Sequence, residues 1–348
     1  MDKMLSVKLK GGFVSSVYSS TTLSSVEKKI ESYGKNAMYV FDENTKDIVS
    51  LDKDRCVVLP SGESAKNCQS IAKIIDKALS LSLARDSIFV AIGGGVVCDM
   101  TAFASSIYMR GARLSLVPTT LLSIVDASLG GKTGIDYCGY KNLIGSFYPA
   151  EEILICTESL KSLSEKEYIC GLGEVVKHAF LSPSWKLYDF LCKNSNMILN
   201  RDLATLLEMI KLSLEVKKHY IEIDPEEKKG IRSFLNLGHT FGHALESITN
   251  YNISHGEGVA WGVAKALEAG EIVSITSDEY KSKAFALLSL YPFDTSLKVP
   301  SDMIEDFLKA ISKDKKKSNG SVKFVLMKGQ GEPVLMPLEE QIVKSIVL

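Results

Sequence analysis

The sequence lacks the features of membrane and secreted proteins. No stretch approaches the roughly 18 consecutive apolar residues that a membrane-spanning helix needs. The N-terminal segment MDKMLSVKLKGGFV has no long apolar run of the kind found in signal peptides. The seven cysteines form no CxxC pair, and their odd number in a chain of 348 residues favours free thiols in a reducing compartment. We therefore expect a cytoplasmic protein with free cysteines.

The sequence also lacks an excess of either charge, because 41 Lys and Arg are balanced by 42 Asp and Glu. This balance argues against nucleic acid or a membrane surface as the partner, and any recognition of anions must be local. No repeat, Pro-rich tract or low-complexity linker interrupts the chain. Apolar residues make up 45% and charged residues 24%, which is typical of a globular protein of one large or two ordinary domains.

Short apolar runs alternate with helical patterns over the first 150 residues. The runs NAMYVFD, CVVLP and SIFVAIGGG predict strands, and the segment KNCQSIAKIIDKALSLSLA predicts one crossover helix between the last two. Strands that alternate with helices indicate βαβ units and a mostly parallel sheet. The first part of the chain is therefore expected to be an α/β domain.

The pattern changes near residue 160, after EEILICTESLKSLS, which predicts a last strand and a polar break. Beyond it the apolar spacing is helical almost throughout, so the second part is expected to be all-α. We place the α/β domain at residues 1–158 and the helical domain at residues 159–348. A cleft between two such domains is a common ligand site.

Two glycine-rich segments suggest phosphate recognition. In the first, Gly93, Gly94 and Gly95 join a buried strand to a helix that carries Asp99 in its first turn. Glycine there lets a pyrophosphate approach the backbone, and a helix N-terminus offers free N–H groups. The sequence is not GxGxxG, however, and such glycines can simply make a tight corner.

The second segment is GGKTG at residues 130–134, in LSLVPTTLLSIVDASLGGKTGID, and Lys141 and Asn142 follow soon after. It lacks the upstream glycine of a Walker A sequence, so ATP hydrolysis is a poor fit. The alternative interpretation is a surface turn with a solvated lysine.

Histidines are few and clustered. Of five in the chain, His239, His243 and His255 lie within seventeen residues, and Glu174 lies in the helical segment GLGEVVKHAF. On a helix His239 and His243 would share one face, as metal ligands do, and imidazole with carboxylate suits zinc or another first-row ion. A single such histidine would more often be structural. Three protein ligands with one open position would make a catalytic rather than a structural centre.

Arg232 stands four residues before Asn236, in a segment that ends at the candidate ligand His239. Most basic side chains are simply solvated, but a planar guanidinium at this place suits a substrate carboxylate or phosphate. The charge pattern and the metal candidates together predict an enzyme that binds a small anionic substrate.

Taken together, the motifs resemble the 3-dehydroquinate synthase family, within the sugar phosphate cyclases, over nearly the whole chain. The resemblance rests on PSGESAK (60–66), GGGVVCD (93–99), YMRGARLSLVPTTLLSIVDASLGGKTGID (108–136), KNLIGSFYP (141–149), GLGEVVKH (171–178), GIRSFLNLGHTFGHALE (230–246), HGEGVAWG (255–262) and DKKKSNGSVKFVL (314–326).

This resemblance implies a Rossmann-like α/β domain, an all-α C-terminal domain, an active site between them, and a homodimer. It implies conversion of 3-deoxy-D-arabino-heptulosonate 7-phosphate to 3-dehydroquinate and phosphate in the shikimate pathway. The expected steps are transient oxidation by NAD, phosphate elimination, re-reduction and intramolecular aldol closure. The expected cofactors are NAD and one divalent metal, zinc or alternatively cobalt.

The resemblance also implies roles for single residues. The metal ligands would be Glu174, His239 and His255, while His243 would form hydrogen bonds or transfer a proton instead of binding the metal. The expected NAD contacts are Asp42, Ser61, Gly62, Glu63, Ser64, Ala65, Lys66, Gly94, Gly95, Val96, Val97, Cys98, Asp99, Thr119, Thr120, Lys132, Lys141, Ser159, Leu160, Lys161 and Ser162. The expected catalytic and substrate contacts are Arg110 (across the dimer interface), Asp126, Lys132, Asn142, Lys177, Lys217, Arg232, Asn236, His243 and Lys315.

The sequence is compatible with alternatives at several positions and in its function. The lysine that binds the substrate carboxylate is Lys217 by its spacing to Asp224 but Lys218 by its spacing to Arg232. Cys98 stands where the family usually has glycine, and a side chain aimed at the pyrophosphate would weaken NAD binding; Ala102 and Ala150 also depart from the family pattern. The rival functions are another sugar phosphate cyclase, a metal-dependent polyol dehydrogenase that consumes NAD, and a non-catalytic binding protein.

Overall fold

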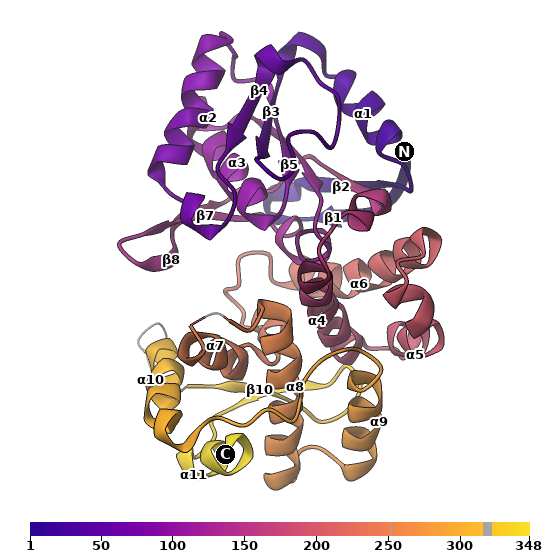
Figure 1. Ribbon diagram of the computed structural model, residues 1–348, viewed down its shortest axis with the longest axis vertical. Helices are drawn as coiled ribbons and strands as arrows, with labels where there is room; N and C mark the ends of the chain where they lie inside the picture. Colours follow the sequence, from indigo (N-terminus) through magenta and orange to yellow (C-terminus); the bar gives the residue numbers. More distant parts are fainter. Residues whose placement is uncertain (251, 316–321) are drawn as a thin grey trace. The chain divides into compact units, whose positions relative to one another are not determined.

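The computed structural model describes residues 1–250, 252–315 and 322–348, and the chain divides into two compact units (Figure 1). Unit 1 comprises Met1–Leu163 and Leu206–Lys211, and unit 2 comprises Ser164–Thr205 and Leu212–Leu348. The boundary expected at residue 158 lies shortly before this division. The return of a short helical stretch to unit 1 was not expected, because no change of composition marks it.

Unit 1 is built on one twisted seven-stranded sheet. In spatial order its strands are β1 (Asp2–Lys8), β2 (Val14–Ser20), β9 (Glu152–Cys156), β6 (Arg113–Pro118), β5 (Ile88–Gly93), β3 (Ala37–Asp42) and β4 (Cys56–Leu59). All neighbours are parallel except β1 and β2, which form an antiparallel edge hairpin. The mostly parallel sheet expected from the apolar runs is thus confirmed. The N-terminal hairpin was not predicted.

The helices of unit 1 are α1 (Leu23–Glu31), α2 (Cys68–Ser80) and α3 (Gly95–Ile107), which accompany the sheet as crossover connections (Figure 1). Helix α2 is the predicted crossover. It begins where the Asn67 side chain accepts a hydrogen bond from the backbone N–H of Ser70, an N-cap that satisfies one of the free donors of the first turn.

The segment GGKTG was expected to be a loop, and this was wrong from Lys132 onward. Lys132 opens strand β7 (Lys132–Tyr137), which pairs with β8 (Tyr140–Phe147) in an antiparallel hairpin. The hairpin closes through Cys138 and Gly139, whose φ angles of 49° and 79° fit a two-residue turn of the tight type that matches strand twist. The turn signal in the sequence lies after the strand, and the glycines that suggested a loop lie before and inside it.

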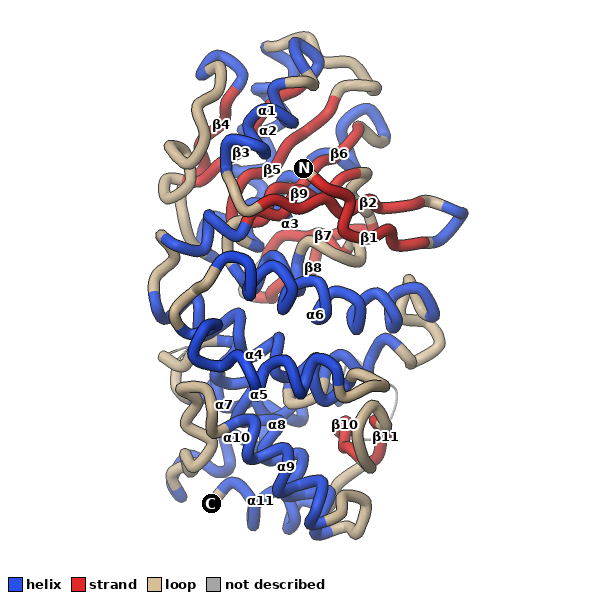
Figure 2. The backbone as a smooth tube through the Cα atoms, turned by 90° about the vertical axis from the view of Figure 1, so that its right-hand side faces the viewer, coloured by secondary structure: helices blue, strands red, loops and turns tan. Residues whose placement is uncertain are grey.

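Unit 2 is mainly helical, as predicted. Its helices are α4 (Glu165–Leu181), α5 (Lys186–Leu199), the outer parts of α6 (Leu203–Ile223), α7 (His239–Ile248), α8 (His255–Ile272), α9 (Asp278–Leu288), α10 (Ile304–Lys315) and α11 (Glu340–Val347) (Figure 2). It is not all-α, because β10 (Phe324–Met327) and β11 (Pro333–Met336) form a small antiparallel sheet. Each strand has only four residues, too few for a strand period to stand out.

None of the helices in the described ranges is both long and apolar enough to cross a membrane. All seven cysteines are free thiols, as the absence of a CxxC pair predicted.

Candidate active site and metal centre

Glycines let three helices of unit 2 approach backbone to backbone. A Cβ atom at Gly256 in α8 would lie 1.8 Å from the carbonyl oxygen of Cys170 in α4, and one at Gly173 in α4 would lie 2.1 Å from the carbonyl oxygen of Gly256. A Cβ at Gly262 in α8 would lie 2.0 Å from the carbonyl oxygen of Gly238, just before α7. No side chain fits at such distances. The helices that carry the predicted metal ligands are therefore in direct main-chain contact.

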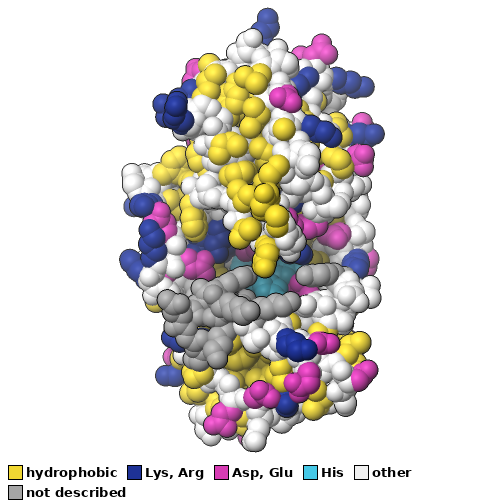
Figure 3. All heavy atoms as spheres, turned by 90° about the vertical axis from the view of Figure 1, so that its left-hand side faces the viewer, with side chains coloured by type: hydrophobic (Ala, Val, Ile, Leu, Met, Phe, Trp, Pro, Cys, Tyr) yellow, Lys and Arg dark blue, Asp and Glu magenta, His cyan; other side chains and the backbone are white. Residues whose placement is uncertain are grey.

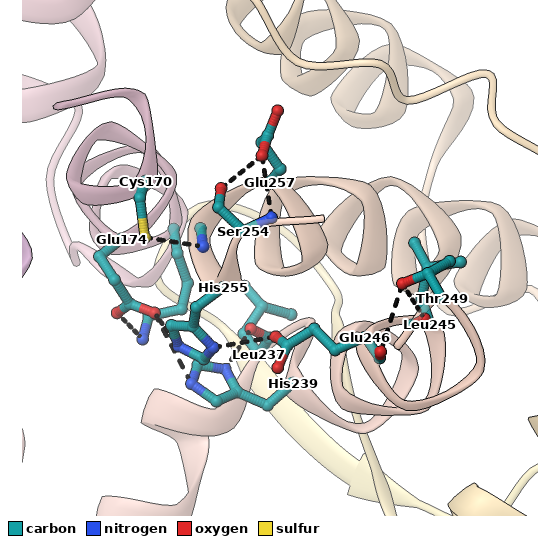
Figure 4. Close-up of polar contacts among 12 residues, drawn as sticks. Cys170, Glu174, Leu237, His239, Leu245, Glu246, Thr249, Ser254, His255 and Glu257 are labelled. Carbon is teal, nitrogen blue, oxygen red and sulfur yellow. Dashed lines mark hydrogen bonds and ion pairs between the residues drawn. The ribbon is translucent and has the colours of Figure 1, made fainter. Parts of the chain in front are cut away.

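This contact brings Glu174 of α4 to His239 of α7 and His255 of α8 (Figure 4). The Oε1 atom of Glu174 lies 3.6 Å from Nε2 of His239 and 3.4 Å from Nε2 of His255. A tetrahedral zinc site with bonds of about 2.0–2.1 Å places its ligand atoms roughly 3.3–3.4 Å apart. Among the described residues Glu174 Oε1 is fully buried and has no hydrogen-bond partner, which is unusual unless an ion binds there. The three residues thus fit a divalent metal.

His243 lies in the same cluster. The ligand nitrogens of His239, His243 and His255 are within 4.8 Å of one another, and the His243 ring is 5.2 Å from that of His239 between centroids. The helix spacing therefore does bring His239 and His243 together, as the sequence indicated. His243 is the exposed member of the group. The distances to Glu174 are closer to tetrahedral spacing, so the ligand set with Glu174 is the better fit, and the role of His243 stays a prediction.

Each predicted ligand has an outer partner. The Lys177 ammonium forms a short ion pair with the Oε2 atom of Glu174, Nδ1 of His239 lies 3.3 Å from the carbonyl oxygen of Leu237, and Nδ1 of His255 lies 3.0 Å from Oε1 of Glu246. Such partners fix the orientation of ligands and the ring nitrogen that carries the proton.

The charges around the site set its protonation. Burial opposes ionisation of Glu174, but Lys177 and the two imidazoles outweigh it and hold the pKa of this carboxyl well below its usual range. Burial and Lys177 lower the pKa of His239 well below normal, which favours the neutral ligand form. Burial also disfavours the charged form of His255, but the carboxylates of Glu174 and Glu246 raise its pKa to about 10 in the metal-free chain. A bound cation would compete with that proton.

Three of the predicted site residues in unit 2 are buried cations. Lys177, Lys217 and Arg232 are each less than 5% exposed. The side chain of Lys218, by contrast, is 33% exposed. Its Nζ atom lies 3.9 Å from Oε1 of Glu222, one turn along α6. The buried position makes Lys217 the better candidate for the carboxylate-binding lysine.

Arg232 is presented by a loop that one carboxylate organises. Asp224 accepts hydrogen bonds from the backbone N–H groups of Lys228, Lys229, Ile231 and Arg232, and Nη1 of Arg232 donates to the carbonyl oxygen of Pro225 at 2.7 Å. The backbone of Arg232 is therefore fixed.

Asn236 ends the same short helix as Arg232 and is exposed. Lys315 is the last residue of α10, and its side chain lies outside the described part of the chain.

The predicted NAD contacts of unit 1 lie where parallel strands end, except Lys132 and Lys141, which lie on the β7–β8 hairpin. Asp42 ends β3, residues 61–66 follow β4, residues 94–99 follow β5, Thr119 and Thr120 follow β6, and residues 159–162 follow β9. The carboxyl ends of parallel strands share one edge of the sheet. The chain runs from β3 to β4 on one side and then returns to β5 on the other, and such a reversal is where open α/β sheets bind their ligands.

Lys66 links two of these segments. Its Nζ atom, in a side chain only 5% exposed, lies 2.6 Å from Oδ2 of Asp99 and 2.5 Å from Oδ1 of Asn142. The backbone N–H of Asp136 in β7 also donates to the carbonyl oxygen of Lys66, at 2.9 Å. The expected cofactor segment is therefore tied to the hairpin that carries the expected substrate contact Asn142.

Cys98 does not aim its side chain out of the sheet edge. Its thiol is 1% exposed and lies 3.7 Å from the carbonyl oxygen of Gly93, and burial raises the pKa of this thiol. The concern that Cys98 might obstruct a pyrophosphate therefore finds no support in its orientation.

The remaining predicted residues of unit 1 are spread over neighbouring segments. Asp126 lies in a short helical turn at Ser123–Ala127, and Lys132 and Asn142 lie on the β7–β8 hairpin. Arg110 follows α3 and is exposed. Met109 and Arg110 have φ angles of 46° and 64°, a backbone conformation that costs energy in non-glycine residues and often accompanies function.

Glu246 is the residue of the centre that the sequence interpretation missed. A signal for it existed, because Glu246 lies seven residues after His239 in GHTFGHALE, two helical turns along the same face. The contact between His239 and the carbonyl oxygen of Leu237 could not be predicted from the sequence, because every residue has a main-chain carbonyl.

Solved structures of similar fold include two synthases. One is a 2-deoxy-scyllo-inosose synthase complexed with carbaglucose-6-phosphate, NAD+ and Co2+, with a TM-score of 0.85 and 21% identity over 99% of this chain and 98% of that one. Another is ValA, a 2-epi-5-epi-valiolone synthase of Streptomyces hygroscopicus with NAD+ and Zn2+ bound, with a TM-score of 0.83 and 20% identity over 95% of both chains. At these identities the likeness shows the fold, which confirms the fold class that we expected.

Comparison of the sequence with known families identifies one family. Residues 56–170 match the 3-dehydroquinate synthase N-terminal family and residues 171–317 match the 3-dehydroquinate synthase C-terminal family. The 3-dehydroquinate synthase of Francisella tularensis subsp. tularensis is 41% identical over 293 residues, which cover 82% of this chain and 80% of that protein. The chain belongs to the 3-dehydroquinate synthase family.

Proposed function

We propose that the chain is a 3-dehydroquinate synthase, a carbon–oxygen lyase that converts 3-deoxy-D-arabino-heptulosonate 7-phosphate to 3-dehydroquinate and phosphate in the shikimate pathway. The observation that carries this proposal is the buried Glu174 Oε1 atom, without a hydrogen-bond partner among the described residues and 3.4–3.6 Å from two imidazole nitrogens, in a chain of this family.

In this proposal Glu174, His239 and His255 hold one divalent metal, zinc or cobalt. Such an ion, when bound, polarises a substrate oxygen and so acidifies the neighbouring C–H bond. Lys177 keeps Glu174 ionised and points its ammonium into the same buried region. A zinc or cobalt ion is present in the two synthases of the same fold, and the carboxylate and imidazole donors of this chain suit either ion.

NAD is proposed to bind along the carboxyl edge of the parallel sheet in unit 1. When bound, it supplies reversible removal and return of one hydride. The turn after β5 leads directly into the N-terminus of α3, whose N–H groups suit a pyrophosphate. At Gly95 an added Cβ would meet only the Cβ of Ala127, at 3.4 Å, so the backbone there is open to approach.

Buried cations of unit 2 are proposed to bind the anionic groups of the substrate. Arg232 and Lys217 suit the carboxylate, since a fixed guanidinium can bind both of its oxygens. Asn236 and Lys315 are proposed as further contacts. His243, exposed beside the metal ligands, is proposed to hold or transfer a proton through its ring nitrogen, a role for which imidazole is suited near neutral pH.

Unit 1 is proposed to contribute Asp126, Lys132 and Asn142 to substrate binding, and Arg110 to the site of a second copy in a homodimer. The support for the homodimer is a group of exposed apolar side chains around the β7–β8 hairpin and the turn at Arg110: Ile107, Met109, Tyr137, Tyr140, Leu143 and Phe147, each at least 45% exposed. Apolar side chains also gather on the face of unit 1 seen in Figure 3. Exposed apolar surface of this kind marks protein interfaces.

The decisive experiment follows the redox balance. The protein, loaded with zinc, is mixed with the heptulosonate phosphate and with NAD well below the substrate concentration, and phosphate and NADH absorbance are followed together. Because the hydride is returned within one cycle, phosphate should exceed total NAD many-fold, while NADH stays no higher than the enzyme concentration. NADH that rises in step with product, without phosphate, would mean a polyol dehydrogenase and would refute the proposal.

A further inference from the structure

Glu246 contacts a proposed metal ligand from outside the ligand set. We propose that Glu246 is a positioning residue that fixes the tautomer of His255 and strengthens metal binding through its negative charge. The inference rests on the proposed function, because it concerns the metal that this function requires.

The Glu246 carboxylate is held against the imidazole of His255. It comes from α7, is 7% exposed, and its Oε1 atom lies 3.0 Å from Nδ1 of His255 (Figure 4). The nearby backbone of α8 leaves little space, because a Cβ at Gly258 would lie 3.2 Å from the same oxygen atom. A carboxylate accepts hydrogen bonds and does not donate them. The proton of a neutral His255 ring is therefore held on Nδ1, which leaves the Nε2 lone pair facing Glu174 and a metal.

The outer partners of the three ligands differ in charge. Glu174 has the Lys177 ammonium, His239 has the neutral carbonyl of Leu237, and His255 has the Glu246 carboxylate. The ammonium adds positive charge next to a site for a cation, which disfavours binding in a buried region where charges are poorly screened. Among these three partners only Glu246 supplies negative charge. Its charge offsets that of Lys177 and makes the imidazole a stronger donor.

A purely structural role for Glu246 predicts something different. A buried acid paired with a histidine could simply hold α7 against α8, in which case its loss would lower the stability of the metal-free chain. A positioning role changes the metal affinity and the electronic environment of the ion. The test therefore needs a readout on the metal itself.

The experiment uses the full chain, stripped of metal and titrated with Zn2+ against a chromogenic chelator, and in parallel loaded with Co2+ for its visible absorption spectrum. Glu246→Gln keeps the shape and one acceptor oxygen but removes the charge, while Glu246→Leu removes both. The matched control is Glu257→Gln, two residues after His255 in the same helix. Glu257 accepts hydrogen bonds from Ser254 in a capping box, a role that glutamine also fills.

We expect Glu246→Gln to weaken Zn2+ binding about 10-fold and Glu246→Leu about 100-fold, with a shifted Co2+ band, and the control to change affinity by less than about twofold. Zn2+ affinity and Co2+ spectra like those of the control in both variants would overturn the inference. If Glu246→Leu does not fold, the Zn2+ affinity and Co2+ spectrum of Glu246→Gln alone test the inference. Zn2+ binding that is equally tight in Glu174→Ala would instead contradict the proposed function, so the two failures are distinguishable.

Discussion

The two units build their candidate sites in opposite ways. In unit 1 the proposed site lies at the ends of parallel strands, and part of it is backbone that glycine leaves accessible, as at Gly95. In unit 2 the site consists of side chains from three helices, and the glycines lie behind it, where the helices touch. Glycine thus exposes the backbone to a ligand in one unit and sets the distance between side chains in the other. Single side-chain changes should therefore affect the site in unit 2 more than the site in unit 1.

The largest expected effect is that of Glu174→Ala. Loss of one of three protein ligands removes both affinity and geometry, so bound metal should disappear and turnover should fall by on the order of 10³-fold or more. His255→Ala should behave alike. Metal content after gel filtration and phosphate release measure the two effects, and Glu279→Ala, 81% exposed in α9, is the control. Full metal occupancy in both ligand variants would show that the ligand assignment is wrong.

His243→Ala separates chemistry from metal binding. Because His243 is proposed to act outside the ligand set, the variant should keep its metal while its turnover falls by about 100-fold or more. The same two measurements, made on His239→Ala in parallel, give the comparison. Metal loss as severe as in His239→Ala would mean that His243 is a ligand, as the helix spacing indicates, and that the ligand set implied by the family resemblance is wrong.

Arg232→Ala distinguishes substrate binding from cofactor binding. A charge-assisted bidentate hydrogen bond is worth about 1.5–3 kcal/mol, so the KM for the substrate should rise roughly 10- to 100-fold and the KM for NAD much less. Arg201→Ala, at an ion pair with Glu165 elsewhere in unit 2, should leave both constants nearly unchanged. An equal rise of both constants in Arg232→Ala is the result that rules out the substrate role.

Two glycine variants change stability without removing a site side chain, and they compare the two uses of glycine directly. Gly256→Ala forces a methyl group against the main chain of α4, so its free energy of unfolding should fall by about 1–3 kcal/mol or more. Gly95→Ala meets only a side chain at ordinary contact distance and should stay within roughly 1 kcal/mol. Denaturant unfolding of both variants measures the difference. Equal destabilisation by Gly256→Ala and Gly95→Ala would mean that the two glycines do not differ in how closely they are packed.

How much the sequence predicts also differs between the units. The central strands of unit 1 were predicted because fully buried parallel strands are unbroken apolar runs, as in SIFVAIG. The β7–β8 hairpin was missed because its burial is partial and its first strand begins inside a glycine-rich motif. The edge hairpin β1–β2 was missed because the buried positions of β2 are Ser15, Val17 and Ser19, so burial alternates along this strand while hydrophobicity does not.

In unit 2 helix spacing alone brings together His239 and His243, which lie one turn apart. It cannot show that Glu174, 65 residues before His239, approaches them, because that depends on which helices pack together. The residue pattern offered Glu174 as a metal candidate, but only the family resemblance assigned it as a ligand in place of His243. The glycines that allow the approach, Gly173 and Gly256, look like weak points in a helix when read from the sequence, and their use appears only when the helices are placed.

The contact at Gly256 has a consequence for genetics. The atom that a larger residue would strike is a main-chain carbonyl oxygen, and every amino acid has that oxygen. No substitution at residue 170 can make room, so a strain that carries a lesion at Gly256 should yield true revertants and no intragenic suppressors at the contact. At Gly93, by contrast, the obstructing atoms belong to the side chain of Val97 and include its Cβ, so glycine at 97 would remove all of them.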